Sequence, residues 1–253
     1  MQYAVITGVS RGLGESVAKL FLEQGIHVIG VSRGESDILT EIAGQNNVSF
    51  RQYSCDLSDL NSIKETFSEI ANNIVEQEPA AMYLVNNAAV LEPINQAMNI
   101  DSEELAYHVQ VNTIAPMTIT NLLLKSATEH DIPLYAAAIT SGAAERPVNG
   151  WSAYCSTKAA LNSYTVTVAL EQEQLNAGHK LIAFSPGIMD TAMQEKIRSS
   201  SESEFADVET FKMYKENKLL KDTDAVGSVL VDILTDKTNI INGKIYNVKE
   251  YLV

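Results

Sequence analysis

The segment that most restricts how this 253-residue chain can fold is its beginning, where an apolar run, a glycine-rich turn and a helical pattern follow one another. Residues 3–6 read as a strand, the turn spans residues 7–14, and apolar residues at helical spacing continue to a stop at Gly25. Glycines let a backbone approach a ligand, and the first N–H groups of a helix attract an anion. We therefore predict a phosphate-binding turn, with an ordinary tight turn as the alternative.

The same alternation continues along the chain. Strands are predicted at 27–31, 48–53, 82–85, 134–139, 181–184 and 244–248, with helices at 63–74, 101–127, 154–168 and 224–234. Strands that alternate with helices indicate a parallel sheet covered on both faces. The predicted fold class is α/β, a Rossmann-type doubly wound parallel sheet, in a single domain over residues 1–253.

Polar or turn-forming residues stand at the ends of these strands. They are Thr7, Ser32, Asp56, Asn86, Ser141 and Pro186. Each is weak evidence alone, because such residues are common in loops. Parallel strands nevertheless bring their carboxyl ends to one edge of the sheet, where ligands bind. We expect these residues to converge on one site.

Composition disfavours several classes of partner. A net charge of -14 and a pI near 4.7 argue against nucleic acid and against an anionic membrane surface. No apolar run approaches the roughly 18 residues of a membrane-spanning helix, and the N-terminus has no basic leader pattern. Cys55 and Cys155 are too few for a disulfide framework and fit a reducing cytoplasm.

The histidines indicate no metal site. They are His27, His108, His130 and His179. They form no metal-ligand spacing with cysteines or carboxylates, so we interpret them as ordinary surface or core residues.

A tyrosine and a lysine form the candidate chemical centre. Tyr154 and Lys158 are four residues apart and share one face of a helix. A neighbouring cation lowers the pKa of a phenol, ordinarily about 10, which eases proton exchange at neutral pH. Ser141 lies upstream, across a turn-rich loop, where its hydroxyl can polarise a carbonyl. We predict a general acid here, although such a pair alone is usually an exposed helix face.

The residues after the second strand bear on the cofactor. Dinucleotide sites commonly place an acid there for the ribose 2′-hydroxyl, or an arginine for a 2′-phosphate. Ser32 and Arg33 occupy this place, and Arg11 in the glycine turn adds a second cation. We therefore predict NADP(H). The alternatives are that Glu35 or Asp37 supplies the acid, or that both arginines are merely solvated.

Composition shifts between residues 193 and 221. Serines and acidic residues there surround Phe205, Phe211, Met213 and Tyr214. We predict a helical lid over the mouth of the site, with an ordinary acidic surface helix as the alternative.

Together these motifs resemble the short-chain dehydrogenase/reductase family over nearly the whole chain. The matching positions are Thr7, Gly12, Gly14, Asp56, Asn86, Asn87, Ala88, Asn112, Ser141, Tyr154, Lys158, Pro186, Gly187 and Thr191. The resemblance implies that Tyr154 is the general acid and that Lys158 lowers its pKa and holds the nicotinamide ribose. It also implies that Ser141 orients a substrate carbonyl and that Asn112 supports a water that relays protons to Lys158.

The resemblance further implies the cofactor contacts. The diphosphate would be held by Gly8, Ser10, Arg11, Gly12, Leu13 and Gly14, and the 2′-phosphate by Ser32 and Arg33. Asp56 and Leu57 would meet the adenine, Asn87 and Ala88 the adjoining ribose, and Pro186, Gly187, Met189 and Thr191 the nicotinamide end. Ala89 stands where the family more usually has glycine, and we expect this methyl group to be tolerated.

Within the family, residues 149–158 and 186–194 resemble the sepiapterin reductase branch. They are most similar to its bacterial benzil reductases, which reduce one carbonyl of an aromatic α-diketone to the (S)-hydroxyketone. Asn247 stands where sepiapterin reductases carry an acid that anchors the pterin, which argues against a pterin substrate. The apolar residues Ala143, Ala144, Trp151, Met189 and Met193, beside Ser141 and Tyr154, would suit a flat aromatic dicarbonyl.

These implications define the expected function and its alternatives. We expect an oxidoreductase of a small-molecule carbonyl substrate that forms a homo-oligomer, a dimer or tetramer. One alternative is a reductase of a pterin or of another ketone. The alternative of another class is a catalytically silent NADP-binding regulator, against which the complete set of Asn112, Ser141, Tyr154 and Lys158 argues.

Overall fold

A parallel sheet forms the centre of the computed structural model, which describes residues 1–34, 36–202 and 204–252. Within that part of the chain the sheet has seven strands in the order β3-β2-β1-β4-β5-β6-β7, and all neighbours pair in parallel. The strands are β1 (Gln2–Thr7), β2 (His27–Val31), β3 (Phe50–Tyr53), β4 (Ala81–Asn86), β5 (Leu134–Ile139), β6 (Lys180–Ser185) and β7 (Ile245–Asn247). The order changes direction between β1 and β4, where doubly wound sheets bind ligands. The predicted Rossmann-type fold is confirmed.

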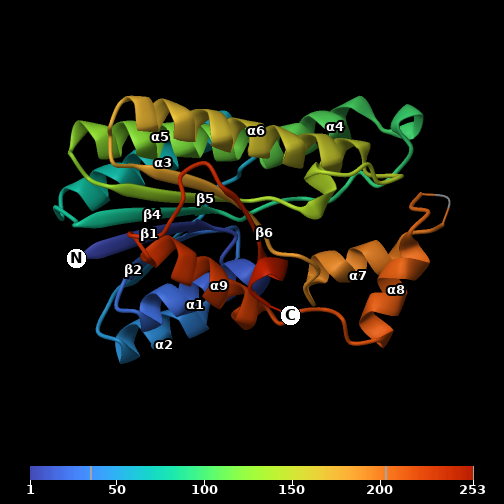
Figure 1. Ribbon diagram of the computed structural model, residues 1–253, viewed down its shortest axis with the longest axis horizontal. Helices are drawn as coiled ribbons and strands as arrows, with labels where there is room; N and C mark the ends of the chain where they lie inside the picture. Colours follow the sequence, from blue (N-terminus) through green and yellow to red (C-terminus); the bar gives the residue numbers. More distant parts are fainter. Residues whose placement is uncertain (35, 203, 253) are drawn as a thin grey trace.

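Helices lie on both faces of this sheet (Figure 1). One face carries α3 (Leu60–Val75), α5 (Ala115–Glu129) and α6 (Ser152–Gln174), and the other carries α1 (Gly12–Glu23), α2 (Asp37–Gln45) and α9 (Thr223–Thr235). Helix α4 (Ser102–Val109) leads toward α5, while α7 (Ala192–Ser199) and α8 (Val208–Glu216) stand apart, at the right of Figure 1. The segment predicted to form a helical lid therefore does contain helices, next to the end of β6.

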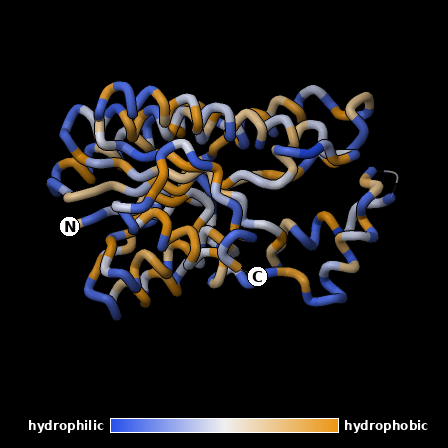
Figure 2. Tube along the Cα trace, in the orientation of Figure 1, coloured by the Kyte–Doolittle hydropathy of each residue, from blue (hydrophilic) through white to orange (hydrophobic). Residues whose placement is uncertain are grey.

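A hydrophobic core on each face holds the helices to the sheet. Ala4 and Ile6 of β1 pack with residues of α1 and α9, whereas Val5 packs with residues of α3 and α5. They alternate because successive strand residues point to opposite faces. The strands are hydrophobic along most of their length (Figure 2), as a sheet covered on both faces requires.

One predicted helix is interrupted. The pattern at 101–127 predicted a continuous helix, but α4 ends at Val109, a π-helical turn spans Gln110–Ile114, and α5 follows. A π-turn adds a residue to a helical turn and occurs frequently at functional sites. Hydrophobic spacing alone does not reveal it, because the apolar side continues across the extra residue.

Two predicted strands are shorter than expected. The strand predicted at 48–53 is Phe50–Tyr53, and the strand predicted at 244–248 is Ile245–Asn247. Both lie at an edge of the sheet, where only one neighbouring strand supplies hydrogen bonds.

Candidate active site

The glycine-rich turn joins β1 to α1. Gly8 and Gly12 have positive φ angles of 77° and 64°, which glycine adopts without strain. A Cβ atom on Gly14 would lie only 2.2 Å from the carbonyl oxygen of Gly8, so this approach of helix to turn requires glycine. Arg11, the N-cap residue, makes no side-chain hydrogen bond to the described first turn of α1. This turn is therefore suited to receive an anion such as the diphosphate of a dinucleotide.

Thr7 and Asn87 brace the turn from β1 and from the end of β4. Asn87 Nδ2 donates to the carbonyl oxygens of Thr7 at 2.9 Å and of Gly8 at 3.3 Å. Thr7 Oγ1 accepts from the N–H groups of Asn87 and Ala88, both at 3.0 Å. Asn87, predicted as a ribose contact, thus fixes the shape of the glycine-rich turn.

Two further loops approach the same turn. A Cβ atom on Gly12 would lie 3.5 Å from Cγ2 of Thr191, which follows β6. A Cβ atom on Gly34, after β2, would lie 3.6 Å from Cβ of Ser10. The ends of β1, β2 and β6 therefore bring predicted cofactor residues together, as the parallel sheet required.

The ends of β2 and β3 carry the residues relevant to cofactor choice. Ser32 Oγ accepts from Gln52 Nε2 at 3.0 Å, while Arg33 and Asp56 are exposed. Hydrogen bonds from Ser58 lower the pKa of Asp56, and the positive charge of Arg33 lowers it further. Arg33 is therefore near Asp56, with its guanidinium in reach of solvent. Of the alternative acids, Asp37 is exposed at the start of α2 and Glu35 lies outside the described residues.

Tyr154 and Lys158 lie one turn apart on α6, with only 7% and 3% of their surfaces exposed. Lys158 Nζ donates to the carbonyl oxygen of Ile139 at 2.8 Å and lies 5.6 Å from the centroid of the Tyr154 ring. The Ser141 side chain lies close enough to the Tyr154 phenol to lower its pKa. The end of β5 thus brings the serine, tyrosine and lysine together.

The pKa of Tyr154 moves against the sequence-based expectation. Burial raises it from 10.0 to about 12, and the hydrogen bond with Ser141 offsets only part of that rise. Burial also lowers the pKa of Lys158 to about 8. The prediction of a lowered phenol pKa is wrong here because burial removes the hydration that stabilises a phenolate, and this is the largest contribution to the pKa. The phenol stays protonated at neutral pH, which is the form that a general acid needs.

Asn112 lies buried in the π-helical turn. Its Oδ1 accepts from the N–H of Val90 at 2.8 Å, and its Nδ2 donates to the carbonyl oxygen of Val90 at 2.7 Å. Nδ2 also lies 3.0 Å from Nε2 of His108, one turn earlier on α4. The amide therefore holds the segment that follows β4.

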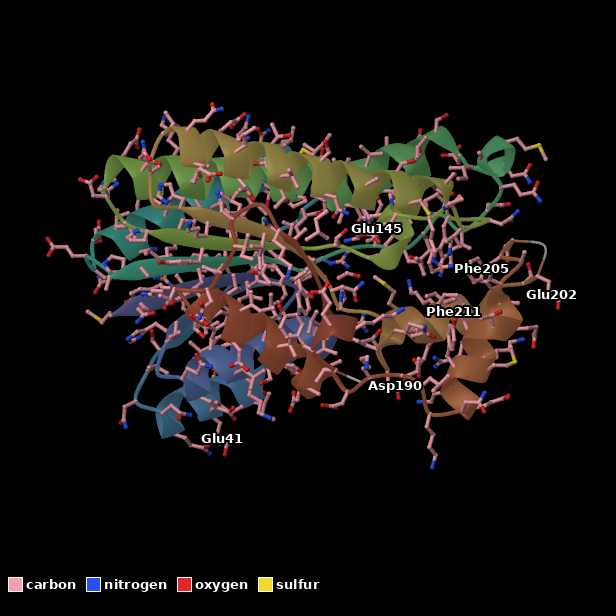
Figure 3. All side chains as sticks on the ribbon, viewed as in Figure 1. Glu41, Glu145, Asp190, Glu202, Phe205 and Phe211 are labelled. Atoms are coloured by element: carbon pink, nitrogen blue, oxygen red, sulfur yellow. The ribbon has the colours of Figure 1, made fainter. Side chains whose placement is uncertain are left out.

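A third hydrophobic core covers the Tyr154 phenol. Trp151 stacks on Phe205 with ring centroids 4.8 Å apart and contacts the rings of Tyr154 and Phe211 edge-on, at 5.4 Å and 5.6 Å. Phe205 and Phe211 lie where α7 and α8 meet the loop that carries Glu145 (Figure 3). Trp151 is 5% exposed and Phe205 is 0% exposed. The α7–α8 segment is thus packed directly onto the residues beside Tyr154.

Gly150 allows that packing. Its φ angle is +80°, and a Cβ atom would lie 2.2 Å from the carbonyl oxygen of Glu204. The backbone before Phe205 can therefore touch the backbone before Trp151 only because this residue is glycine.

Residues 2–202 match the family described as short chain dehydrogenase. The chain belongs to this family. Two Bacillus relatives are named benzil reductase ((S)-benzoin forming). The Bacillus cereus protein is 36% identical over 234 residues, which are 92% of this chain and 94% of that protein. The protein of Bacillus subtilis (strain 168) is 36% identical over 252 residues, 100% of both chains.

Solved structures of the family share the fold. The short chain dehydrogenase/reductase YIR035C of Saccharomyces cerevisiae is 28% identical, with a TM-score of 0.84 over 98% of this chain and 96% of that chain. The KRED1-Pglu enzyme is 25% identical, with a TM-score of 0.81 over 97% of this chain and 100% of that chain. The chain is therefore an oxidoreductase of carbonyl or alcohol groups by family.

The predicted cofactor residues of this dehydrogenase differ in burial. Leu13, Gly14, Tyr154, Lys158 and Pro186 are buried; Gly8, Ser10, Gly12, Ser32, Leu57, Asn87, Ala88, Gly187, Met189 and Thr191 are half-buried; Arg11, Arg33 and Asp56 are exposed. The buried residues lie at the start of α1, on α6 and after β6. The exposed charges lie where the predicted phosphate and adenine ends would be.

The predicted substrate wall is only partly brought together. Ala143 and Trp151 lie in the third core, and Met193 packs against it. Met189 packs against the main core beneath α1 and α9 instead, because its loop pairs with Lys221.

Sequence reasoning missed His108 as a residue of the site region. It is 0% exposed, and its ring lies 6.2 Å from the Tyr154 ring, edge-on. A single histidine without a spaced partner gives no sequence signal of this kind. One feature of the sequence indicates that His108 lies near the site: it stands four residues before Asn112, on the same face of the predicted helix.

Neither a metal site nor a membrane span is found in the described ranges. No group of three or more histidine, cysteine, aspartate or glutamate residues there could hold a metal ion. Among the same residues, no helix combines the length and the apolar character needed to cross a bilayer.

Proposed function

We propose that this protein is an NADPH-dependent reductase of one carbonyl of an aromatic α-diketone, converting benzil to (S)-benzoin. The observation that carries the proposal is a protonated, buried Tyr154 phenol beside Ser141 and next to a cluster of aromatic rings. The names of the Bacillus relatives support the same reaction. An aromatic surround favours a flat apolar substrate because it buries ring surface without unpaired polar groups.

The residues of the chain divide the proton chemistry among them. With a pKa raised to about 12, Tyr154 holds its proton until the carbonyl oxygen gains negative charge, and then donates it. Ser141, whose side chain acts on the same phenol, donates to the same carbonyl oxygen and orients it. NADPH, when bound, supplies the hydride. Lys158, fixed by Ile139, provides a positive charge near the phenolate that remains.

We assign the cofactor preference to Arg33 and Arg11. Both are exposed and lie at the ends of β2 and β1, and Ser32 stands where NAD-binding sites commonly have an acid. Two arginines can pair with a 2′-phosphate through charge-assisted hydrogen bonds. NADP(H) is therefore favoured over NAD(H).

We also propose that the α7–α8 segment is a substrate lid, at about residues 193–221. Trp151 and Tyr154 are almost completely covered when Phe205 is in place. A diaryl substrate needs access to Tyr154, so this segment has to move away from Trp151 to admit it. Closure afterwards excludes water from the proton transfer.

The expected setting is cytoplasmic, and the expected assembly is a homo-oligomeric dimer or tetramer. Both described cysteines, Cys55 and Cys155, are free thiols, as in a reducing compartment. Sedimentation of the purified protein would measure the number of subunits.

The test of the proposed function is NADPH oxidation with benzil and sepiapterin in parallel, with NADH as the cofactor control. We expect turnover of benzil with NADPH and formation of (S)-benzoin, identified by chiral chromatography. Turnover of sepiapterin without turnover of benzil would show that the substrate is a pterin and not an aromatic diketone. Binding of NADPH without turnover of either substrate would favour another ketone or a regulator.

A further inference from the structure

A buried histidine lies between the catalytic helix and the segment that follows β4. His108 on α4 is 0% exposed. Its Nδ1 lies 2.7 Å from the carbonyl oxygen of Glu92, and its Nε2 lies 3.0 Å from Nδ2 of Asn112 and 3.1 Å from Oγ1 of Thr157. Thr157 is on α6 between Tyr154 and Lys158. One imidazole therefore connects α4, the loop after β4 and the catalytic helix.

The surrounding groups define which ring nitrogen carries the proton. The N–H of Val90 can only donate, so its partner on Asn112 is Oδ1, and Nδ2 faces His108. An amide nitrogen only donates, so His108 Nε2 must accept and carries no hydrogen. The carbonyl oxygen of Glu92 only accepts, so His108 Nδ1 must carry the hydrogen. Both constraints give the same neutral tautomer.

The geometry points to His108 as a positioning residue of the reductase. As a neutral imidazole with its hydrogen on Nδ1, it holds the Asn112 amide and Thr157, and so fixes the turn of α6 that presents Tyr154 and Lys158. Because Nε2 carries no hydrogen, the single hydroxyl hydrogen of Thr157 is the one that joins Oγ1 to His108. Oγ1 also lies 3.0 Å from the carbonyl oxygen of Ala153 and 3.1 Å from that of Tyr154, which are its alternative acceptors. A shift of His108 is therefore transmitted to the backbone that carries the phenol.

Protonation of His108 would break this arrangement. A hydrogen on Nε2 would face the N–H group of Asn112, so two donors would oppose each other. Three titratable groups face the ring. Lys158 lowers the pKa of His108, Glu92 raises it, and Tyr154 presents its ring edge. Burial is the largest effect and lowers the pKa, so the ring stays neutral below the ordinary value of 6.5.

The chain offers a matched control in His179. This histidine is also buried, accepts at Nδ1 from the N–H of Leu134 at 3.1 Å, and has Nε2 3.0 Å from Oγ1 of Thr128. It precedes β6, so it stands at the end of that strand opposite the site. The two histidines differ mainly in whether their partners reach Tyr154 and Lys158.

The test compares His108→Asn, His108→Gln and His179→Asn in benzil reduction. An asparagine side chain reaches only to the position of the ring atom Nδ1, so the Asn112 amide loses its acceptor. A glutamine side chain is longer and can place Oε1 near the position of Nε2, where it accepts from Asn112. We expect His108→Asn to lower kcat about 10- to 100-fold with an NADPH Kd changed less than about twofold, because misplacement acts on chemistry and not on cofactor binding. His108→Gln restores most of kcat, and His179→Asn lowers the melting temperature without lowering kcat. Equal losses of kcat in both asparagine variants, or no loss in His108→Asn, would overturn the proposal.

Two further readouts separate positioning from a general loss of stability. The wild-type kcat falls on the acid side of pH 6.5 as His108 protonates, and this decrease is absent in His108→Gln. A decrease of the same size in His108→Gln would contradict the role of His108 as a positioning residue. Nitrogen NMR of the wild-type imidazole shows hydrogen on Nδ1 and none on Nε2 at pH 7, and the opposite tautomer contradicts the placement. The inference rests on the proposed reduction: absence of benzil turnover by the wild type would refute that function, while the NMR result would still decide the placement of His108.

Discussion

The two halves of the candidate site are built in different ways. The cofactor half is centred on one short turn, in which Gly8 and Gly14 are in close contact and the Asn87 side chain bonds the backbone, at the ends of two neighbouring strands. The substrate half joins Trp151 to Phe205 of a segment more than 50 residues later, through ring stacking and one backbone contact. The first half is therefore fixed by the sheet, whereas the second depends on a segment outside the sheet, which we propose to be a lid.

This difference predicts which properties vary independently. A turn fixed by hydrogen bonds and glycines presents one geometry to any dinucleotide, so cofactor binding should survive changes in the aromatic core. An aromatic core outside the main sheet can rearrange without disturbing the strands, so substrate choice should vary without loss of the cofactor. Substitutions confined to one half test this separation.

The largest expected effect is on the proton donor. Tyr154→Phe removes the hydroxyl and keeps the ring that contacts Trp151 and His108. We expect kcat for benzil to fall about 10²- to 10⁴-fold, because general-acid catalysis is lost, while NADPH binding is kept. Stopped-flow turnover and NADPH fluorescence titration measure the two quantities. Turnover equal to the wild type would remove Tyr154 from the mechanism.

The cofactor half of the site could be predicted from the sequence more completely than the substrate half. The fold and the glycine turn were predicted because their signals are local: a strand, closely spaced glycines and a helix. The Tyr154–Lys158 pair was found for the same reason. The rise in the Tyr154 pKa was not predicted, because it depends on how completely other segments cover the phenol. The stacking of Phe205 on Trp151 requires the folded structure for a similar reason, since no sequence pattern relates the two residues.

The second-largest effect is expected on the preference for NADPH over NADH. Arg33→Ala removes an exposed guanidinium near Asp56 and touches no aromatic residue of the third core. We expect the Kd of NADPH to rise about 10- to 100-fold and that of NADH to change little, as for the loss of hydrogen bonds to a charged group. Equal losses for both cofactors would mean that Arg33 does not contact the 2′-phosphate, and an unchanged kcat for bound NADPH is the control.

Two glycine substitutions compare the halves directly. A Cβ atom on Gly14 or on Gly150 would lie 2.2 Å from a backbone oxygen, of Gly8 in one case and of Glu204 in the other. We expect Gly14→Ala to weaken NADPH binding without altering the fluorescence of Trp151, the single tryptophan of the chain. Gly150→Ala should shift that fluorescence and raise the KM for benzil at an unchanged NADPH Kd. Each substitution should lower the free energy of unfolding by about 1–3 kcal/mol, as overpacking of a filled site does.

Gly44→Ala is the matched control for both substitutions. Gly44 lies within α2, and an added Cβ would have no atom within 4 Å among the described residues. Alanine there should be neutral or stabilising by up to about 1 kcal/mol, since it is the better helix former. A fluorescence change in Gly14→Ala as large as in Gly150→Ala would show that the two halves are coupled and would contradict the separation.

The smallest effect expected is on the dependence of stability on pH. Burial lowers the pKa of both His108 and His179 below 6.5, so the unfolded chain binds protons first as the pH falls through 6.5. Unfolding therefore becomes easier from about pH 6.5 down to the folded-state pKa values, whereas Asp56 and Asp224, with pKa values below 3.8, stay ionised there. Urea unfolding at pH 7.5 and pH 5.5 measures the loss. His179→Asn should remove part of the loss. The part due to His108 should end at the pH where the acid fall in kcat is centred, because both report the folded-state pKa of that ring. Stability that did not change over this range would contradict the neutral state of both rings.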